Sequence, residues 1–142
     1  WGKMIGGDGG CFEAALESVR TYGGVLEHPA YSIAWSWFGL PRPGRGGWTS
    51  AFDDPGLATE VSQGAYGHDA RKRTWIYYVG SAPPPELNWR DPQGKGVVGA
   101  GVNSGQAAGR GRIDGYAASR TPPAFRDALL KMARSSALAA AA

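Results

Sequence analysis

The sequence predicts an α/β domain in which a short, mostly parallel sheet is flanked by helices and by a Gly/Pro-rich loop region. Three observations support this fold class. A helical apolar pattern at 11–22 stops at two glycines and leads directly into a short apolar strand and a loop. Residues 74–80 are rich in aromatic and β-branched side chains, which is typical of a strand. A second helical pattern begins after Thr121. Such alternation of helices and strands is typical of α/β sheets.

The domain organisation follows from length and composition. The chain has 142 residues, of which 42% are hydrophobic, and this suits a single domain, 1–142, with one modest core. We expect the α/β core at 11–80 and the C-terminal helix at 121–142. Residues 81–120 supply few large apolar groups, so they bury too little surface to offset the entropy of ordering. This stretch is therefore expected to be a flexible Gly/Pro-rich segment.

The first helix is predicted at 11–22, with Asp8 near its entry. Its apolar side chains fall at i, i+3, i+4 and i+7, which places them on one face: Phe12, Ala15, Leu16 and Val19. Gly23 and Gly24 end the helix. Cys11 has apolar neighbours and is expected to be a small buried residue rather than a nucleophile.

A short strand follows the first helix and ends in a carboxylate. Val25 and Leu26 form the strand, Glu27 lies at its carboxyl end, and Pro29 ends it. Ligands of open α/β sheets bind beyond the carboxyl ends of strands. Glu27 is therefore a candidate functional acid, the alternative being a carboxylate that is hydrogen-bonded to a loop.

The remaining elements are predicted from local pattern. Residues 30–38 favour a short helix, 41–56 an irregular surface loop, and 57–64 a short strand. The strand at 74–79 is expected beside the one at 24–27, with Trp75 in the core. In the last helix we expect Thr121 as the cap and Pro122 at the first helical position, with an apolar face of Phe125, Leu129 and Met132.

Charge and cysteine content restrict the class of protein. The net charge of +3 permits contact with a phosphate backbone without requiring it. The single cysteine excludes an internal disulfide and favours a reducing compartment. No Cys or His cluster has metal-ligand spacing, no apolar run reaches the roughly 20 residues of a membrane helix, and no signal-peptide pattern is present. We therefore expect neither a metal nor a membrane partner.

Three stretches, GGVLEHP (23–29), YGHDARKRTWIYYVG (66–80) and SRTPPAFRDALLKMA (119–133), occur in an informative order. They resemble the later motifs of the cytosine-C5 DNA methyltransferase family. In that family a strand delivers a Glu, a Tyr-Gly stretch carries two alternate arginines before an aromatic strand, and a C-terminal helix packs beside the cofactor site. The resemblance implies a partial Rossmann-like methyltransferase sheet. Phage-encoded methylase-like proteins are similar in the first two stretches.

The resemblance implies roles for individual residues. Glu27 is implied as the acid that contacts the ring nitrogen of a flipped cytosine, while Arg71 and Arg73 position the base and Glu27. Two arginines at i and i+2 of an extended segment point the same way and suit bidentate contacts. Residues implied to lie near S-adenosylmethionine are Ser119, Arg120 and Thr121. Residues expected to contact nucleic acid are His68, Lys72, Arg110 and Arg112.

The expected function is that of a DNA (cytosine-5) methyltransferase-like protein of phage or prophage origin, located in the cytoplasm of a bacterial host. The chain lacks the family's Phe-x-Gly-x-Gly cofactor loop and its Pro-Cys nucleophile motif, and it begins with Trp1. We therefore expect a fragment or remnant, whose partners are DNA and either a missing N-terminal half or a second copy of the chain. Catalysis by this chain alone stays open. The alternative is a noncatalytic module on the same fold that binds nucleic acid or a protein partner.

Overall fold

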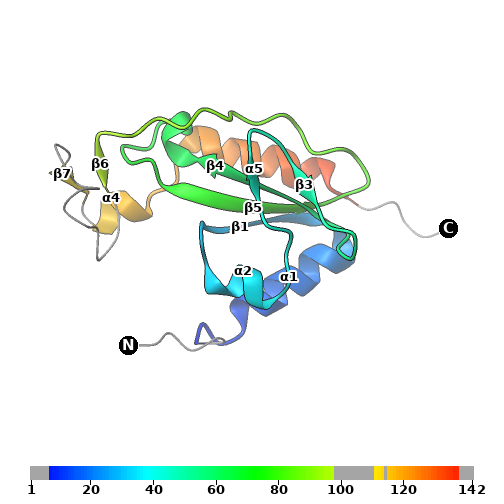
Figure 1. The fold of residues 1–142 in the computed structure, drawn as a ribbon. Coiled ribbons are helices and arrows are strands. Elements are labelled where there is room, and N and C mark those ends of the chain that lie inside the picture. The colour runs from blue at the N-terminus through cyan, green and yellow to red at the C-terminus, as the bar shows by residue number, and fades with distance from the viewer. Residues whose placement is uncertain (1–6, 98–110, 114, 138–142) are drawn as a thin grey trace.

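The computed structural model describes residues 7–97, 111–113 and 115–137. Its elements, drawn in Figure 1, follow in the order α1 (Cys11–Tyr22), β1 (Gly24–Pro29), α2 (Ile33–Trp37), β2 (Gly44–Arg45), β3 (Thr49–Ser50), β4 (Leu57–Ser62), the 3₁₀-helix η1 (Gln63–Tyr66), β5 (Arg73–Val79), β6 (Gly96–Val97), β7 (Gly111–Arg112), α4 (Gly115–Ser119) and α5 (Pro123–Ser135). The α/β class is confirmed.

The main sheet is mixed and mostly antiparallel. Its order is β1-β5-β4-β2, with β3 also paired to β4, and only the β2–β4 pair is parallel. The prediction of a mostly parallel sheet is therefore wrong. Residues 63–72 alone connect β4 to β5, whereas a parallel crossover needs about a dozen residues or more. The chain consequently reverses direction and places β5 antiparallel to β4.

The predicted adjacency of the first strand and the aromatic strand is confirmed. β1 pairs with β5 from Gly24↔Val79 to Pro29↔Thr74, and the pairing is antiparallel. Because β1 and β4 are both antiparallel to β5, they run parallel to each other. Their carboxyl ends therefore lie at the same edge of the sheet, next to the beginning of β5.

One face of the sheet packs against α1 and α2. The predicted apolar face of α1 is confirmed, with Phe12, Leu16 and Val19 buried. These side chains share a core cluster with Trp35 of α2 and with strand residues Ala58, Trp75, Tyr77 and Val79. The prediction that Trp75 lies in the core is confirmed. Successive strand residues alternate between faces, so the odd-numbered residues of β5 lie on this α1/α2 face.

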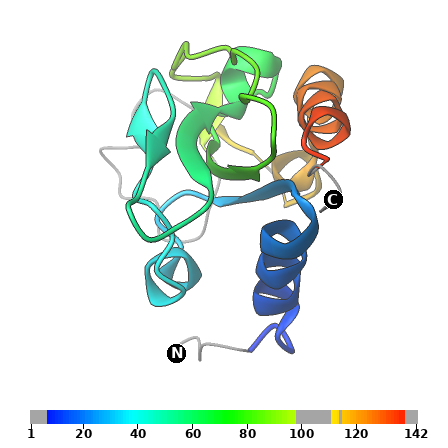
Figure 2. The ribbon, with the colours of Figure 1, turned by 90° about the vertical axis from the view of Figure 1, so that its right-hand side faces the viewer.

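The opposite face of the sheet packs against α5. Ile76 and Tyr78 of β5 form a second cluster with Val61 of β4 and with Phe125 and Met132 of α5. Figure 2 shows β1 between α1 and α5, so the sheet is covered on both faces at that strand. The two periodic apolar helices of the sequence thus enclose the sheet from opposite sides.

Two local predictions about helix ends are corrected. Cys11 begins α1 but is exposed, because the buried stripe passes through Phe12 and the preceding position points to solvent. Thr121 does not cap α5, whose N-cap is Pro122 with no side-chain cap bond and with Pro123 as the first helical residue. Asp8 does lie near the start of α1, where its carboxylate accepts hydrogen bonds from the backbone N–H groups of Gly10 and Phe12.

Two loop segments carry more structure than their Gly and Pro content indicates. The predicted irregular loop at 41–56 contains the two-residue strands β2 and β3, which pair with β4. Residues 81–97 run back along the sheet from the end of β5 toward its beginning (Figure 1). Leu87 and Trp89 pack against the α5-side cluster on the way. Residues 98–110 lie outside the described residues.

Candidate functional site

Residues from distant parts of the sequence meet where β1 and β4 end and β5 begins. We call this part of the molecule the carboxyl edge. It holds the last residues of β1, the turn η1 that follows β4, and the segment 71–73 that leads into β5. Because β1 and β4 run in the same direction on either side of β5, the segments that follow them lie together at this edge. The carboxyl edge is therefore the candidate functional region.

Glu27 and the two arginines do not share a pocket there. Glu27 is the cross-strand partner of Ile76, so its side chain lies on the α5 face, and it is exposed. Arg73 alternates with Thr74 and therefore lies on the face of Trp75, toward α1 and α2. The expected contact of Glu27 with Arg71 and Arg73 is thus wrong, because antiparallel pairing at this register separates the carboxylate from the guanidinium groups by the sheet itself.

The two arginines instead converge on Asp91. Arg71 forms a bidentate ion pair with Asp91 through Nε and Nη2, and Nη2 of Arg73 lies 3.8 Å from Asp91 Oδ2. The hydrogen bonds from Arg71 hold the pKa of Asp91 below its ordinary value, so this carboxylate is ionised at neutral pH. The expectation that both arginines point the same way holds, but their carboxylate partner comes from the Gly/Pro-rich segment.

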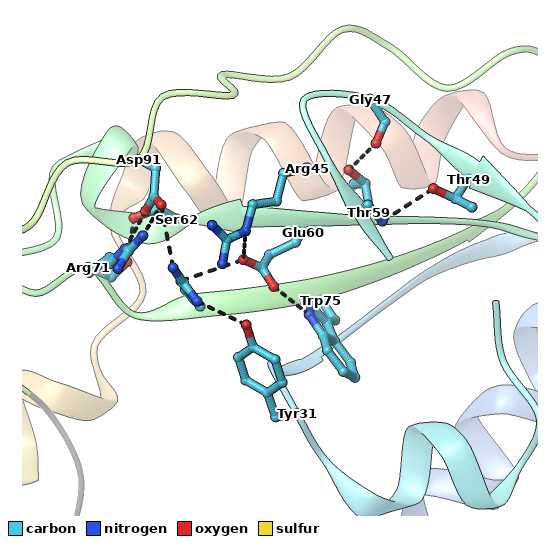
Figure 3. A network of polar contacts seen from close by, with 12 residues as sticks. Tyr31, Arg45, Gly47, Thr49, Thr59, Glu60, Ser62, Arg71, Trp75 and Asp91 are labelled. Carbon is cyan, nitrogen blue, oxygen red and sulfur yellow. Dashed lines mark hydrogen bonds and ion pairs between the residues drawn. The ribbon is translucent and has the colours of Figure 1, made fainter. Parts of the chain in front are cut away.

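Glu60 is the second carboxylate of this group. Its side chain is 8% exposed and accepts hydrogen bonds from Nε of Arg45 at 3.0 Å and from the indole Nε1 of Trp75 at 2.8 Å. Arg73 Nε lies 3.6 Å from Glu60, too far for a hydrogen bond, and this buried nitrogen has no hydrogen-bond partner in the described structure. Figure 3 shows the network, which links β2, β4 and β5 to the segment around Asp91.

A small cleft lies beside this network. It encloses about 20 Å³, roughly the room of one water molecule, and its lining residues are Arg45, Glu60, Val61, Ser62, Trp89, Arg90 and Asp91. A cofactor the size of a nucleoside does not fit inside so small a space. A larger ligand at this cleft would therefore rest on its rim, where the arginines are. We call Arg45, Arg71, Arg73 and Arg90, together with Glu60 and Asp91, the arginine cluster.

The α5 side of the carboxyl edge holds other predicted residues. Lys72 donates hydrogen bonds from Nζ to the carbonyl groups of Ser119 and Arg120, at 3.4 and 3.1 Å. Burial lowers the pKa of Lys72, while the charge of Glu27 acts in the opposite direction. The structure therefore brings Glu27 and Lys72 close to the segment expected to contact S-adenosylmethionine.

That segment does not by itself form a cofactor site. Ser119, Arg120 and Thr121 are exposed, and two of their carbonyl groups already accept hydrogen bonds from Lys72. They offer no buried set of donors and acceptors of the kind that fixes a nucleoside in a cleft. We derive no chemical step through S-adenosylmethionine from these residues.

The remaining predicted residues lie in varied surroundings. His68 is buried, and its Nδ1 accepts a hydrogen bond from the backbone N–H of Ala70, so its ring supports a turn rather than facing solvent. Arg112 belongs to β7, and Arg110 lies outside the described residues. Among the described residues, no group of three or more His, Cys, Asp or Glu side chains is arranged to hold a metal ion.

The hydroxyl of Tyr31 also lies at the cluster, where it accepts a 2.9 Å hydrogen bond from Nη1 of Arg73. Five residues of the site were not identified from the sequence: Tyr31, Arg45, Glu60, Arg90 and Asp91. Glu60 could have been recognised, because it is a charged residue within the apolar strand LATEVS, and a buried charge requires a partner. No feature of the sequence indicates Asp91, since an Asp before Pro is ordinary in a loop.

Comparison of the chain with protein-family models, with curated proteins and with solved structures finds no match in any of the three. Within the part of the chain that the structure describes, no helix has both the length and the apolar character needed to cross a membrane. The geometry of the carboxyl edge is therefore the basis for assigning a function.

Proposed function

We propose that this chain binds nucleic acid through the arginine cluster, as the DNA-contacting part of a cytosine-C5 DNA methyltransferase-like protein of phage or prophage origin. The observation that supports binding is the charge of the cluster. Three guanidinium groups, those of Arg45, Arg71 and Arg73, lie beside two carboxylates at the carboxyl edge, which leaves an excess of one positive charge. Arg90 also lines the adjacent cleft. An excess of this kind, gathered on one face, is the electrostatic footprint of a phosphate-binding surface.

The carboxylates position the guanidinium groups without using all of their donors. An Arg side chain has five N–H donors in a planar fork that matches phosphate oxygens. The Nε–H of Arg45 donates a hydrogen bond to Glu60, while the Arg45 side chain remains 56% exposed. Arg71 and Arg73 are held in place by Asp91 and Glu60. The cluster is therefore a preorganised set of donors, and a phosphate can bind with little loss of side-chain entropy.

Duplex DNA binding measured by fluorescence anisotropy at about 50 mM and about 200 mM salt tests the proposal. Arg45→Ala and Arg90→Ala should each weaken binding several-fold on every sequence and reduce the salt slope by about one. Arg126→Ala is the matched control, since Arg126 is an exposed arginine of α5 paired with its neighbour Asp127. The proposal fails when the wild-type chain does not bind DNA, or when Arg126→Ala weakens binding as much as Arg45→Ala does.

Methyl transfer is a second candidate function. It is favoured by one observation, which is that Lys72 links the end of β1, where Glu27 lies, to Ser119 and Arg120. Glu27 and Arg73 lie on opposite faces of the sheet, which favours the noncatalytic alternative. Calorimetric titration with S-adenosylmethionine separates the two. A saturable heat that is reduced in Lys72→Ala supports methyl transfer, and no heat alongside salt-dependent DNA binding leaves the noncatalytic module.

A further inference from the structure

Tyr31 has a backbone conformation that its side chain makes costly. It follows β1 with φ at 66°, in the left-handed region. This region favours glycine, and a bulky residue there is an outlier that persists only when its surroundings hold it. The hydrogen bond from the backbone N–H of Ala30 to the carbonyl of Arg73 holds the adjacent turn. The position therefore suits glycine, yet the chain has an aromatic residue there.

Core packing does not account for that aromatic ring. Tyr31 is 59% exposed, although its ring lies 5.2 Å from the ring of Trp75 with an angle of 57° between the planes. Its hydroxyl accepts a 2.9 Å hydrogen bond from Nη1 of Arg73. The ring thus contacts the sheet on one side, and the residue as a whole remains more than half exposed to solvent. Rigid aromatic side chains of this kind form platforms on which bases stack.

The charges beside Tyr31 identify what such a platform would bind. The Tyr31 hydroxyl, and after it the charge of Glu60, raise the pKa of Arg45, so that guanidinium group lies near the tyrosine hydroxyl. Arg45 is also paired with Glu60, whose other oxygen accepts from Trp75 beneath the tyrosine ring. Figure 3 shows the tyrosine next to the ion pairs of the arginine cluster. An exposed aromatic ring beside exposed guanidinium groups is the combination with which proteins hold unpaired nucleotides, the ring taking the base and the cations taking the backbone.

We propose that Tyr31 is a stacking platform for an unpaired base of single-stranded DNA, whose adjacent phosphate binds Arg45. This inference rests on the proposed function, because it names the form of nucleic acid that the arginine cluster holds. Stacking tolerates any base, since every base has a π-face, so binding should show little sequence preference. Duplex DNA keeps its bases stacked within the helix and should gain nothing from Tyr31.

The test compares two oligonucleotides that carry the same number of phosphates, about twelve, one made of thymidines and one of abasic tetrahydrofuran nucleotides. The wild-type chain should bind the thymidine strand about tenfold more tightly. Tyr31→Gly should lower thymidine binding to the level at which the same variant binds the abasic strand. Glycine suits the left-handed backbone, which offsets the lost contacts with Trp75 and Arg73, so this variant should fold. Tyr31→Phe should keep most of the thymidine preference.

Tyr22→Ala is the control, since Tyr22 is a 73% exposed tyrosine that precedes the opposite end of β1. It should leave both affinities unchanged. Equal wild-type affinity for the two strands, together with weaker binding of both by Arg45→Ala, overturns the stacking inference and leaves the proposed function standing. A preference for thymidine that survives Tyr31→Gly overturns it as well. Failure of the wild-type chain to bind either strand while it binds duplex DNA overturns the stacking inference alone, and failure to bind duplex DNA as well overturns both proposals.

Discussion

Glu60 of β4 and Trp75 of β5 are cross-strand partners, and the indole Nε1 of Trp75 donates a 2.8 Å hydrogen bond to Glu60 Oε2. Both residues are buried on the α1/α2 face. Glu60 is also the carboxylate next to which Arg45 and Arg73 lie. Removing it therefore leaves the buried indole N–H of Trp75 and the Nε–H of Arg45 without their acceptor, and takes a negative charge away from Arg73.

Glu60→Ala should lower the free energy of unfolding by about 2 kcal/mol, measured by urea denaturation, because the buried indole N–H of Trp75 loses its acceptor. Glu60→Gln should cost about half as much, since the amide oxygen still accepts from Trp75. Glu86→Ala is the control. Glu86 accepts a hydrogen bond from the Trp89 indole but is exposed, so its loss should cost about 0.5 kcal/mol or less. Equal effects of Glu60→Ala and Glu86→Ala would contradict the structural role given to Glu60.

Gly56 lies against the ring of Tyr77. A Cβ atom at this position would overlap the phenol ring and lie 2.6 Å from its oxygen. Tyr77 is fully buried, and its hydroxyl donates a 2.6 Å hydrogen bond to Asp54, so the ring cannot easily shift. Gly56→Ala should therefore destabilise the fold by about 2 kcal/mol in thermal or urea unfolding. Gly47→Ala, whose added Cβ meets nothing within 4 Å, should be close to neutral, and a comparable loss in that variant would show that the Tyr77 contact is not the cause.

Tyr77 should make stability depend on alkaline pH. Burial, and then its hydrogen bond to Asp54, raise the pKa of Tyr77 to about 12, whereas an unfolded tyrosine titrates near 10. A group whose folded pKa is raised contributes stability that is complete below the unfolded pKa and is lost as pH rises through the folded pKa.

The difference in unfolding free energy between the wild type and Tyr77→Phe should thus be constant below about pH 9 and should shrink by about 2 kcal/mol by about pH 12. Denaturant titrations at a series of pH values measure it. Parallel curves for the two proteins over this range would refute the prediction.

Asp91 should hold the segment 86–92 against the sheet. Its ion pairs with Arg71 and Arg73 are the charged contacts that tie this segment to β5, next to the backbone N–H of Asn88, which donates to the Tyr66 hydroxyl. In Asp91→Asn, the amide of Asn88 should exchange with deuterium up to about fivefold faster, since a surface-accessible ion pair contributes up to about 1 kcal/mol. Asp127→Asn, at the exposed pair on α5, should leave that amide unchanged.

The contribution of Asp91 should also depend on acid pH. Because its folded pKa is lowered, the stabilisation is present above the ordinary pKa of an aspartate and is lost as pH falls through the folded value. The unfolding free energies of the wild type and Asp91→Asn should therefore differ at neutral pH and converge below about pH 4. A difference that persists in acid would mean that the carboxylate charge is not what holds the segment.

The sequence alone determined the two long helices and the aromatic strand, together with the face that each of them buries. The helical spacing of Phe12, Leu16 and Val19 in α1, the aromatic and β-branched run of β5, and the apolar stripe of α5 each specify a buried face, and the structure confirms all three. The sequence also predicted that β1 and β5 are neighbours. The buried faces are local properties, because periodicity and residue type indicate burial within one element.

Tertiary structure alone decided the direction and register of the strands, and with them the composition of the site. A buried apolar strand has the same residue pattern whether its neighbour is parallel or antiparallel. The sequence pattern therefore could not show that β5 runs opposite to β1 and β4, between which it lies. Side chains alternate with a period of two, and the register therefore placed Glu27 on one face and Arg73 on the other. Asp91 reaches Arg71 only because the Gly/Pro-rich segment returns along the sheet, and no local pattern encodes the path of such a segment.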